Sequence, residues 1–355
     1  MTPSTTDKPA AASPGAGRFA DTSSERSLES LALTLGAITF VLVALVAMIA
    51  FRFEPAPISG PGSVGQFAAI SSAVVAFVAV GAGLFLVRRN GGPRSGVLDY
   101  LDIAAIAFAH AVISLLGWTL LAVILEQAFI GAEVFPLAVL IIGGAASAAT
   151  VYVAFYSATH MDLQLLATVL AVFLVLGVLA SMLTATDPEW WKDNLSALGM
   201  SSNASAFAFN ITIIVAGFLV TTLARSATRG VPTDNPTGMR SVRRCLVIVG
   251  IFLALVGVFP VDDFFALHTG VASGMLVAYA VLVIGLPRWI TGISRTFVLL
   301  GWLFLAVSIV LAVLFVVGYY TLTAVELVAG ILVFTWIVLF IRNSAALEHD
   351  VRGEQ

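Results

Sequence analysis

The chain alternates ten long apolar stretches with shorter polar connections. The stretches cover residues 31–52, 66–87, 101–125, 134–156, 163–184, 203–224, 243–260, 265–286, 296–318 and 321–341. Each is about 18 to 25 residues long, and a helix rising ~1.5 Å per residue needs about 20 residues to cross the hydrocarbon of a bilayer. The strands of a membrane barrel would alternate apolar and polar residues with a period of two, and these stretches do not. The pattern therefore predicts an all-α, polytopic transmembrane helix bundle of about ten spans.

The basic residues fall in every second connection. If the N-terminus is placed in the cytoplasm, 15 of the 17 lysines and arginines lie on that side, and only Arg52 and Lys192 lie on the other. Loops rich in lysine and arginine remain on the cytoplasmic side of a membrane. The charge pattern therefore predicts a protein of the cell membrane with both its N-terminus and its C-terminus cytoplasmic.

Composition agrees with a membrane protein and argues against several other classes. Hydrophobic residues make up 60% of the chain and charged residues 10%, against about 45–50% and about 25% in soluble domains. The net charge of −3 offers no strongly basic face, so nucleic acid is not an expected partner. The single cysteine, Cys245, excludes an intramolecular disulfide.

Both ends of the chain are polar. Residues 1–28 are rich in Ser, Thr, Pro, Ala and Gly, and such a composition buries too little apolar surface to fold. We therefore predict a disordered cytoplasmic tail over 1–28 and a short cytoplasmic tail over 343–355.

One connection, residues 185–202, carries the signals of local structure. Pro188 suits the first turn of a helix capped by Asp187, and Gly199 suits its end. This pattern predicts a short helix that lies on the outer membrane surface.

Small residues are dense in the fourth and eighth apolar stretches. Gly143 and Gly144 lie in the former, and Gly270 and Gly274 in the latter. Because small residues let helices approach closely in lipid, both spans are expected at the centre of the bundle.

Polar residues in or beside the spans gather on the predicted outer side. Ionisable or strongly polar residues inside spans are costly and often mark function. We predict an outward-facing polar pocket lined by Asp193, Asn194, Ser196, Asn210, Asp262, Asp263, His268 and Glu326. Its expected ligand is a small molecule or a lipid, and membrane lipids are the expected partners.

Several of these residues have a structural alternative. Asp262 or Asp263 would cap the eighth span, and Asn210 would make a hydrogen bond between helices. Glu326 would face the aqueous interface, and His268 would hydrogen-bond a neighbouring helix.

Three polar residues outside this cluster are expected to serve the fold. Asn203 is predicted to cap the sixth span, and Asp102 to cap the third. His110, which lies deep in the third span between two alanines, is predicted to be packed and neutral.

Sequence motifs for catalysis are absent. The chain contains no HExxH pair, P-loop, GxSxG elbow, dinucleotide fingerprint or kinase signature, and no cofactor is predicted. An intramembrane metal-dependent hydrolase could still be assembled from His268, Asp263 and Asp193, because imidazole and carboxylate groups bind metals. That enzyme is the catalytic alternative to a binding protein.

Two segments resemble a known family. The run 194–199 (Asn-Leu-Ser-Ala-Leu-Gly) with Phe209-Asn210, and the run 257–260 (Gly-Val-Phe-Pro) with His268, resemble an uncharacterised prokaryotic membrane family, domain of unknown function (DUF) 998. The resemblance implies a helical membrane bundle over 131–342 and makes 29–130 a three-span extension.

The sequence thus leaves three functional hypotheses. The leading one is a non-enzymatic protein that is transporter-like or interacts with lipids. Carriers often contain repeats and helices broken near the middle of the bilayer, and neither is visible here. The metal-dependent hydrolase and a structural or accessory membrane subunit are the alternatives.

Overall fold

The computed structural model describes residues 16–91, 96–200, 203–228, 235–290 and 292–353. Over these residues it contains ten α-helices that are long and apolar enough to cross a membrane, which confirms the predicted all-α polytopic bundle. The helices are α1 (Ala16–Phe51), α2 (Val64–Gly91), α3 (Val97–Ala128), α4 (Pro136–Thr159), α5 (Leu163–Leu183), α6 (Ala204–Ala227), α7 (Pro236–Val258), α8 (Phe265–Trp289), α9 (Arg295–Val316) and α10 (Leu322–Gly353).

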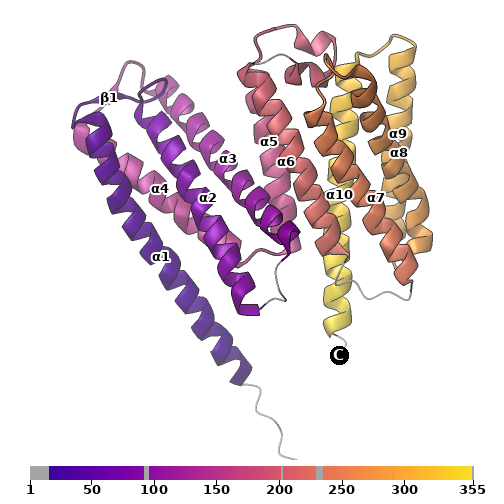
Figure 1. Ribbon diagram of the computed structural model, residues 1–355, viewed down its shortest axis with the longest axis horizontal. Helices are drawn as coiled ribbons and strands as arrows, with labels where there is room; N and C mark the ends of the chain where they lie inside the picture. Colours follow the sequence, from indigo (N-terminus) through magenta and orange to yellow (C-terminus); the bar gives the residue numbers. More distant parts are fainter. Residues whose placement is uncertain (1–15, 92–95, 201–202, 229–234, 291, 354–355) are drawn as a thin grey trace, which may run out of the picture.

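Four shorter elements lie in the connections. The strands β1 (Ala56–Pro57) and β2 (Glu133–Val134) pair antiparallel, and η1 (Trp190–Lys192) and η2 (Leu195–Gly199) are 3-10 helices. They lie at the end of the bundle opposite the described start of α1 and the end of α10 (Figure 1). We call the end with β1, β2, η1 and η2 the distal end, and the opposite end the proximal end.

Helices form because a backbone in hydrocarbon must satisfy its own hydrogen bonds. Side-chain oxygens accept hydrogen bonds from first-turn amides of several helices: Asp162 Oδ1 accepts from Leu165 N, Asn203 Oδ1 from Ala206 N, Asn235 Oδ1 from Gly238 N, and Ser63 Oγ from Gln66 N at the start of α2. The predicted cap at Asn203 is therefore confirmed.

The helices at both ends of the chain extend further than the apolar pattern indicated. Helix α1 begins at Ala16, so residues 16–28 of the expected disordered tail are helical. The remainder of that tail, residues 1–15, lies outside the described residues. Helix α10 continues through most of the expected second tail to Gly353. Extending an existing helix adds a hydrogen bond per residue without a new nucleation cost, and both extensions start from stable spans.

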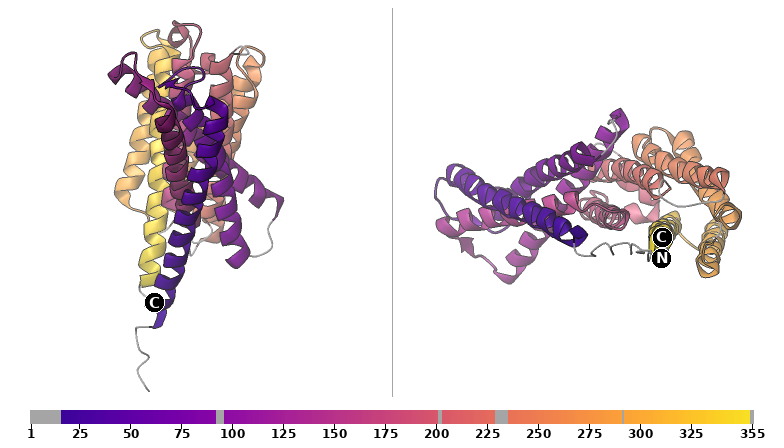
Figure 2. Two further views of the ribbon diagram at one scale, coloured as in Figure 1. Left: turned by 90° about the vertical axis from the view of Figure 1, so that its left-hand side faces the viewer. Right: turned by 90° about the horizontal axis from the view of Figure 1, so that it is seen from below.

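The helices form two units that stand side by side (Figures 1 and 2). In the first unit, α4 packs against α1 and α2, and α2 packs against α3. A methyl group on Gly144 would lie 2.9 Å from the Phe40 carbonyl oxygen of α1, so the two backbones approach closely. Helix α4 therefore packs with α1–α3.

The second unit contains α5–α10, and its most buried helix is α6. A methyl group on Gly217 of α6 would lie 2.4 Å from the Gly250 carbonyl oxygen of α7, which explains the close packing of these helices. Helix α8 is less buried than α6, and its two glycines differ: a methyl group on Gly274 would lie 2.6 Å from the Phe252 ring of α7, whereas one on Gly270 would meet no atom of another element within 4 Å. Small residues therefore identify close approach only where a partner helix is present.

Strands β1 and β2 join the distal ends of the first unit. Ala56 pairs with Val134 and Pro57 with Glu133, which connects the α1–α2 segment to the α3–α4 segment. Ala56, Val64 and Val139 form a small buried apolar cluster beneath this pair.

Asp102 connects the two units near their proximal ends. Its Oδ1 atom accepts a hydrogen bond of 2.7 Å from Thr222 Oγ1 and forms an ion pair with Arg225, both on α6. The prediction that Asp102 caps α3 was wrong, because α3 begins five residues earlier at Val97 and Asp102 lies beyond its first turn. Asp102 is buried, so it requires these partners.

Replacing Asp102 with alanine should destabilise the protein by about 3 kcal/mol, because removing one member of a buried ion pair leaves the other charge uncompensated. The measurement is the free energy of unfolding in detergent micelles. Asp162→Ala is the matched control, since it removes the same charge at an exposed helix cap and should cost about 1 kcal/mol. Equal losses in the two variants would contradict a special role for Asp102.

Candidate functional site

Four of the eight predicted site residues meet around the short helix η2. They are Ser196 within it, Asn210 on α6, His268 on α8 and Glu326 on α10. We call these four residues the η2 cluster. The structure thus brings together residues up to 130 positions apart in the sequence. They meet through direct hydrogen bonds with each other and with the η2 backbone.

Glu326 binds the beginning of η2. Its Oε2 atom accepts a hydrogen bond of 2.6 Å from Leu195 N. The predicted single helix from Pro188 to Gly199 is therefore replaced by η1 and η2, which meet at an extended Asn194. Glu326 supplies an acceptor for an amide group that a continuous helix would have bonded internally.

Asn210 binds the end of η2. Its Nδ2 atom donates to the Gly199 carbonyl oxygen at 2.9 Å. A methyl group on Gly199 would lie 2.4 Å from Asn210 Oδ1, so only glycine allows this approach. Gly199 does end the element, as the sequence predicted, and it also makes room for the side chain that holds that end.

His268 binds the middle of η2 through Ser196. Its Nδ1 atom lies 2.7 Å from the Phe259 carbonyl oxygen, and its Nε2 atom lies 3.0 Å from Ser196 Oγ. A carbonyl oxygen only accepts, so Nδ1 carries the proton. In the neutral ring, Nε2 then accepts the hydrogen bond that Ser196 donates.

The other four predicted residues are Asp193, Asn194, Asp262 and Asp263. Asp193, Asp262 and Asp263 are exposed. Neither Asp262 nor Asp263 caps α8, whose N-cap is Phe264 with no side-chain capping bond. Asn194 is half-buried, and its Oδ1 atom is buried with no hydrogen-bond partner among the described residues.

A serine hydroxyl bonded to a histidine is the arrangement of an activated nucleophile. Ser196 and His268 are, however, only 8% and 5% exposed. The amide group of Leu195, which could otherwise stabilise an oxyanion, is bonded to the Glu326 carboxylate. The geometry therefore favours positioning of η2 over acyl transfer.

The proposed metal-dependent hydrolase also lacks support from the geometry. Over the described ranges, no group of three or more histidine, cysteine, aspartate or glutamate side chains could hold a metal ion. His268, the residue on which that hypothesis depends, uses both ring nitrogens for bonds within the protein.

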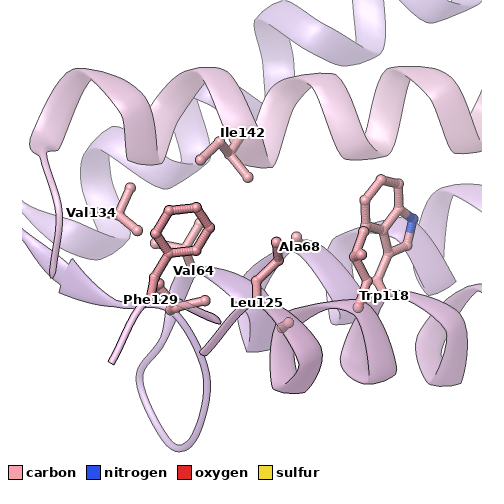
Figure 3. A pocket seen from close by; sticks show the side chains of 11 residues that line it. Val64, Ala68, Trp118, Leu125, Phe129, Val134 and Ile142 are labelled. Atoms are coloured by element: carbon pink, nitrogen blue, oxygen red, sulfur yellow. The ribbon is translucent and has the colours of Figure 1, made fainter. Parts of the chain in front are cut away.

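An apolar pocket at the distal end of the first unit was not predicted. It has a volume of about 210 Å³ and lies between α2, α3 and α4 beneath the strand pair (Figure 3). Its lining consists of Ile58, Val64, Gly65, Ala68, Trp118, Leu121, Ala122, Leu125, Phe129, Val134 and Ile142. Apolar residues within apolar spans give no local sequence signal, which is why sequence reasoning missed it.

Two features define the chemistry of this pocket. The indole N–H of Trp118 is the only polar side-chain group in the pocket lining. Its Nε1 atom donates to Thr150 Oγ1 at 2.8 Å, so the lining offers little to a polar ligand. Leu121, Leu125, Phe129 and Ile142 are also exposed on the surface, so the pocket opens onto the apolar exterior of the unit.

Removing the Ser196 hydroxyl should lower the free energy of unfolding by about 1–3 kcal/mol, because Ser196→Ala leaves a buried acceptor on His268 unsatisfied. Chemical denaturation in micelles provides the measurement. Ser308→Ala is the control, since this buried hydroxyl only bonds the Phe304 carbonyl oxygen of its own helix. If both variants lose the same free energy, the bond to His268 does not hold η2.

Comparison with known proteins agrees with the resemblance seen in the sequence. No curated protein and no solved structure matches the chain. Residues 165–343 match the family described as "Protein of unknown function (DUF998)". The match begins within α5 and ends at the last residue of the span formed by α10, so it covers the second unit and the whole η2 cluster. The chain is therefore a multi-pass membrane protein that belongs to the DUF998 family.

Proposed function

We propose that this protein is a non-enzymatic, lipid-interacting membrane protein whose distal pocket takes up part of a lipid acyl chain. The observation that carries the proposal is the apolar lining of the pocket between α2, α3 and α4. Its volume of about 210 Å³ is below the ~300 Å³ typical of small-molecule sites. It therefore suits a segment of a flexible chain.

The same lining favours lipid interaction over solute transport. A carrier would present polar groups to a solute near the middle of the bilayer. Here the indole N–H of Trp118 is already donated to Thr150. The η2 cluster was the predicted ligand site, but its polar groups are hydrogen-bonded to the protein itself.

The membrane and the orientation are part of this proposal. The basic residues support a cell-membrane protein with both termini in the cytoplasm. In that orientation the distal end, and with it the pocket, faces the outer leaflet.

Filling the pocket should prevent acyl-chain binding. A phospholipid with a photoactivatable diazirine on its acyl chain should label pocket peptides of the reconstituted protein, mapped by mass spectrometry. Leu125→Trp should reduce this labelling severalfold, because the larger side chain occupies the pocket. Leu120→Trp, at a similarly exposed position of α3 outside the lining, should not.

Two results would contradict the proposal. One is equal labelling of pocket peptides in Leu125→Trp and in the unmodified protein. The other is an equal decrease in Leu120→Trp, which would mean that any bulk on α3 changes lipid contact.

A further inference from the structure

A second pocket lies at the proximal end, where α8 turns into α9. It has a volume of about 460 Å³ and is lined by Pro287, Ile290, Gly292, Ile293, Arg295, Val298 and Leu299. Gly292 adopts a φ of +84°, which favours glycine and allows the chain to turn between the two helices. The pocket is therefore built by the connection between two spans.

The lining of this pocket combines one cation with apolar walls. Arg295 is the first residue of α9 and is exposed. Among the ion pairs of the described residues, none involves Arg295. Its charge is thus available to an anion from outside the protein.

The apolar walls continue along the surface of α9. Val298 lies one turn after Arg295 and is half-buried, and Leu299 beside it is 68% exposed. Because α9 is a candidate span that starts at Arg295, these side chains lie at the depth where lipid headgroups give way to acyl chains.

We propose that this proximal pocket binds an anionic phospholipid, with the phosphate on the Arg295 guanidinium and an acyl chain along Val298 and Leu299. A guanidinium pairs well with phosphate oxygens, and basic pockets between membrane helices recognise anionic headgroups. The apolar walls select an amphiphile over free phosphate, which would leave them exposed to water. This site is at the opposite end of the molecule from the acyl-chain pocket and does not depend on it.

The test is native mass spectrometry of the full chain, titrated with phosphatidylglycerol or phosphatidylcholine. The unmodified protein should bind phosphatidylglycerol more tightly than phosphatidylcholine. Arg295→Gln should weaken phosphatidylglycerol binding about fivefold, as one cation at a membrane surface contributes about that factor. Arg295→Lys should retain most of the affinity.

Arg244→Gln is the matched control. Arg244 is also exposed near the proximal end, on α7, and lies outside the pocket lining. It should leave phosphatidylglycerol binding unchanged. Thermal unfolding should be the same for both variants, because both side chains are exposed.

Three outcomes would overturn the proposal. If Arg295→Gln binds phosphatidylglycerol as tightly as the unmodified protein, Arg295 does not hold the headgroup. If Arg244→Gln loses as much affinity for phosphatidylglycerol, the preference for this lipid over phosphatidylcholine is a general effect of positive charge. If millimolar inorganic phosphate displaces the lipid, the site recognises phosphate alone. Leu125→Trp leaves this site intact, so its result separately tests the acyl-chain pocket.

Discussion

A polar group in hydrocarbon must find a partner within the protein, and most of this structure follows from that requirement. The backbone meets it by forming ten long helices. Polar side chains within the spans meet it locally, as when Ser308 bonds the carbonyl of Phe304 one turn earlier. The same requirement applies to η2, which lies in a connection but is largely buried within the protein, and whose short turns leave amide and carbonyl groups unbonded at both ends. Glu326 and Asn210 satisfy those groups from two different helices.

This requirement also explains how the two units stay together. Helix α3 makes fewer contacts with α5 and α6 than with α2 of its own unit, and lipid offers little hydrophobic driving force for packing helices. The buried Asp102 adds an interaction between the units, because separating it from Thr222 and Arg225 would leave a buried charge without a partner. The interaction connects α3 of the first unit to α6 of the second near their proximal ends, beside the apolar contacts that α3 makes with α5 and α6.

The sequence could predict the spans because hydrophobic length is a local property. It could also predict that Ser196, Asn210, His268 and Glu326 meet, since topology places their helix ends on one side. It could not predict the assignment of α4, which depends on Gly144 meeting Phe40 of a distant helix. The sequence also could not show whether these polar residues line a pocket or hydrogen-bond one another directly, because the two arrangements differ by only a few ångströms. The prediction for Asp102 failed because its partners, Thr222 and Arg225, lie 120 and 123 residues away in the sequence.

The two buried histidines show why direct bonding is the better interpretation of the η2 cluster. His110, in the other unit, places Nδ1 2.8 Å from the Ile106 carbonyl oxygen and Nε2 2.9 Å from Ser157 Oγ. His268 has the same two types of partner, a carbonyl oxygen and a serine hydroxyl. A neutral imidazole has one donor and one acceptor, and this pair of partners satisfies both.

Because the same pair of hydrogen bonds appears at two unrelated places, the burial of a histidine is a sufficient reason for it. A catalytic role would need a further feature at His268 that His110 lacks, and the nearby Glu326 carboxylate at η2 would oppose an oxyanion.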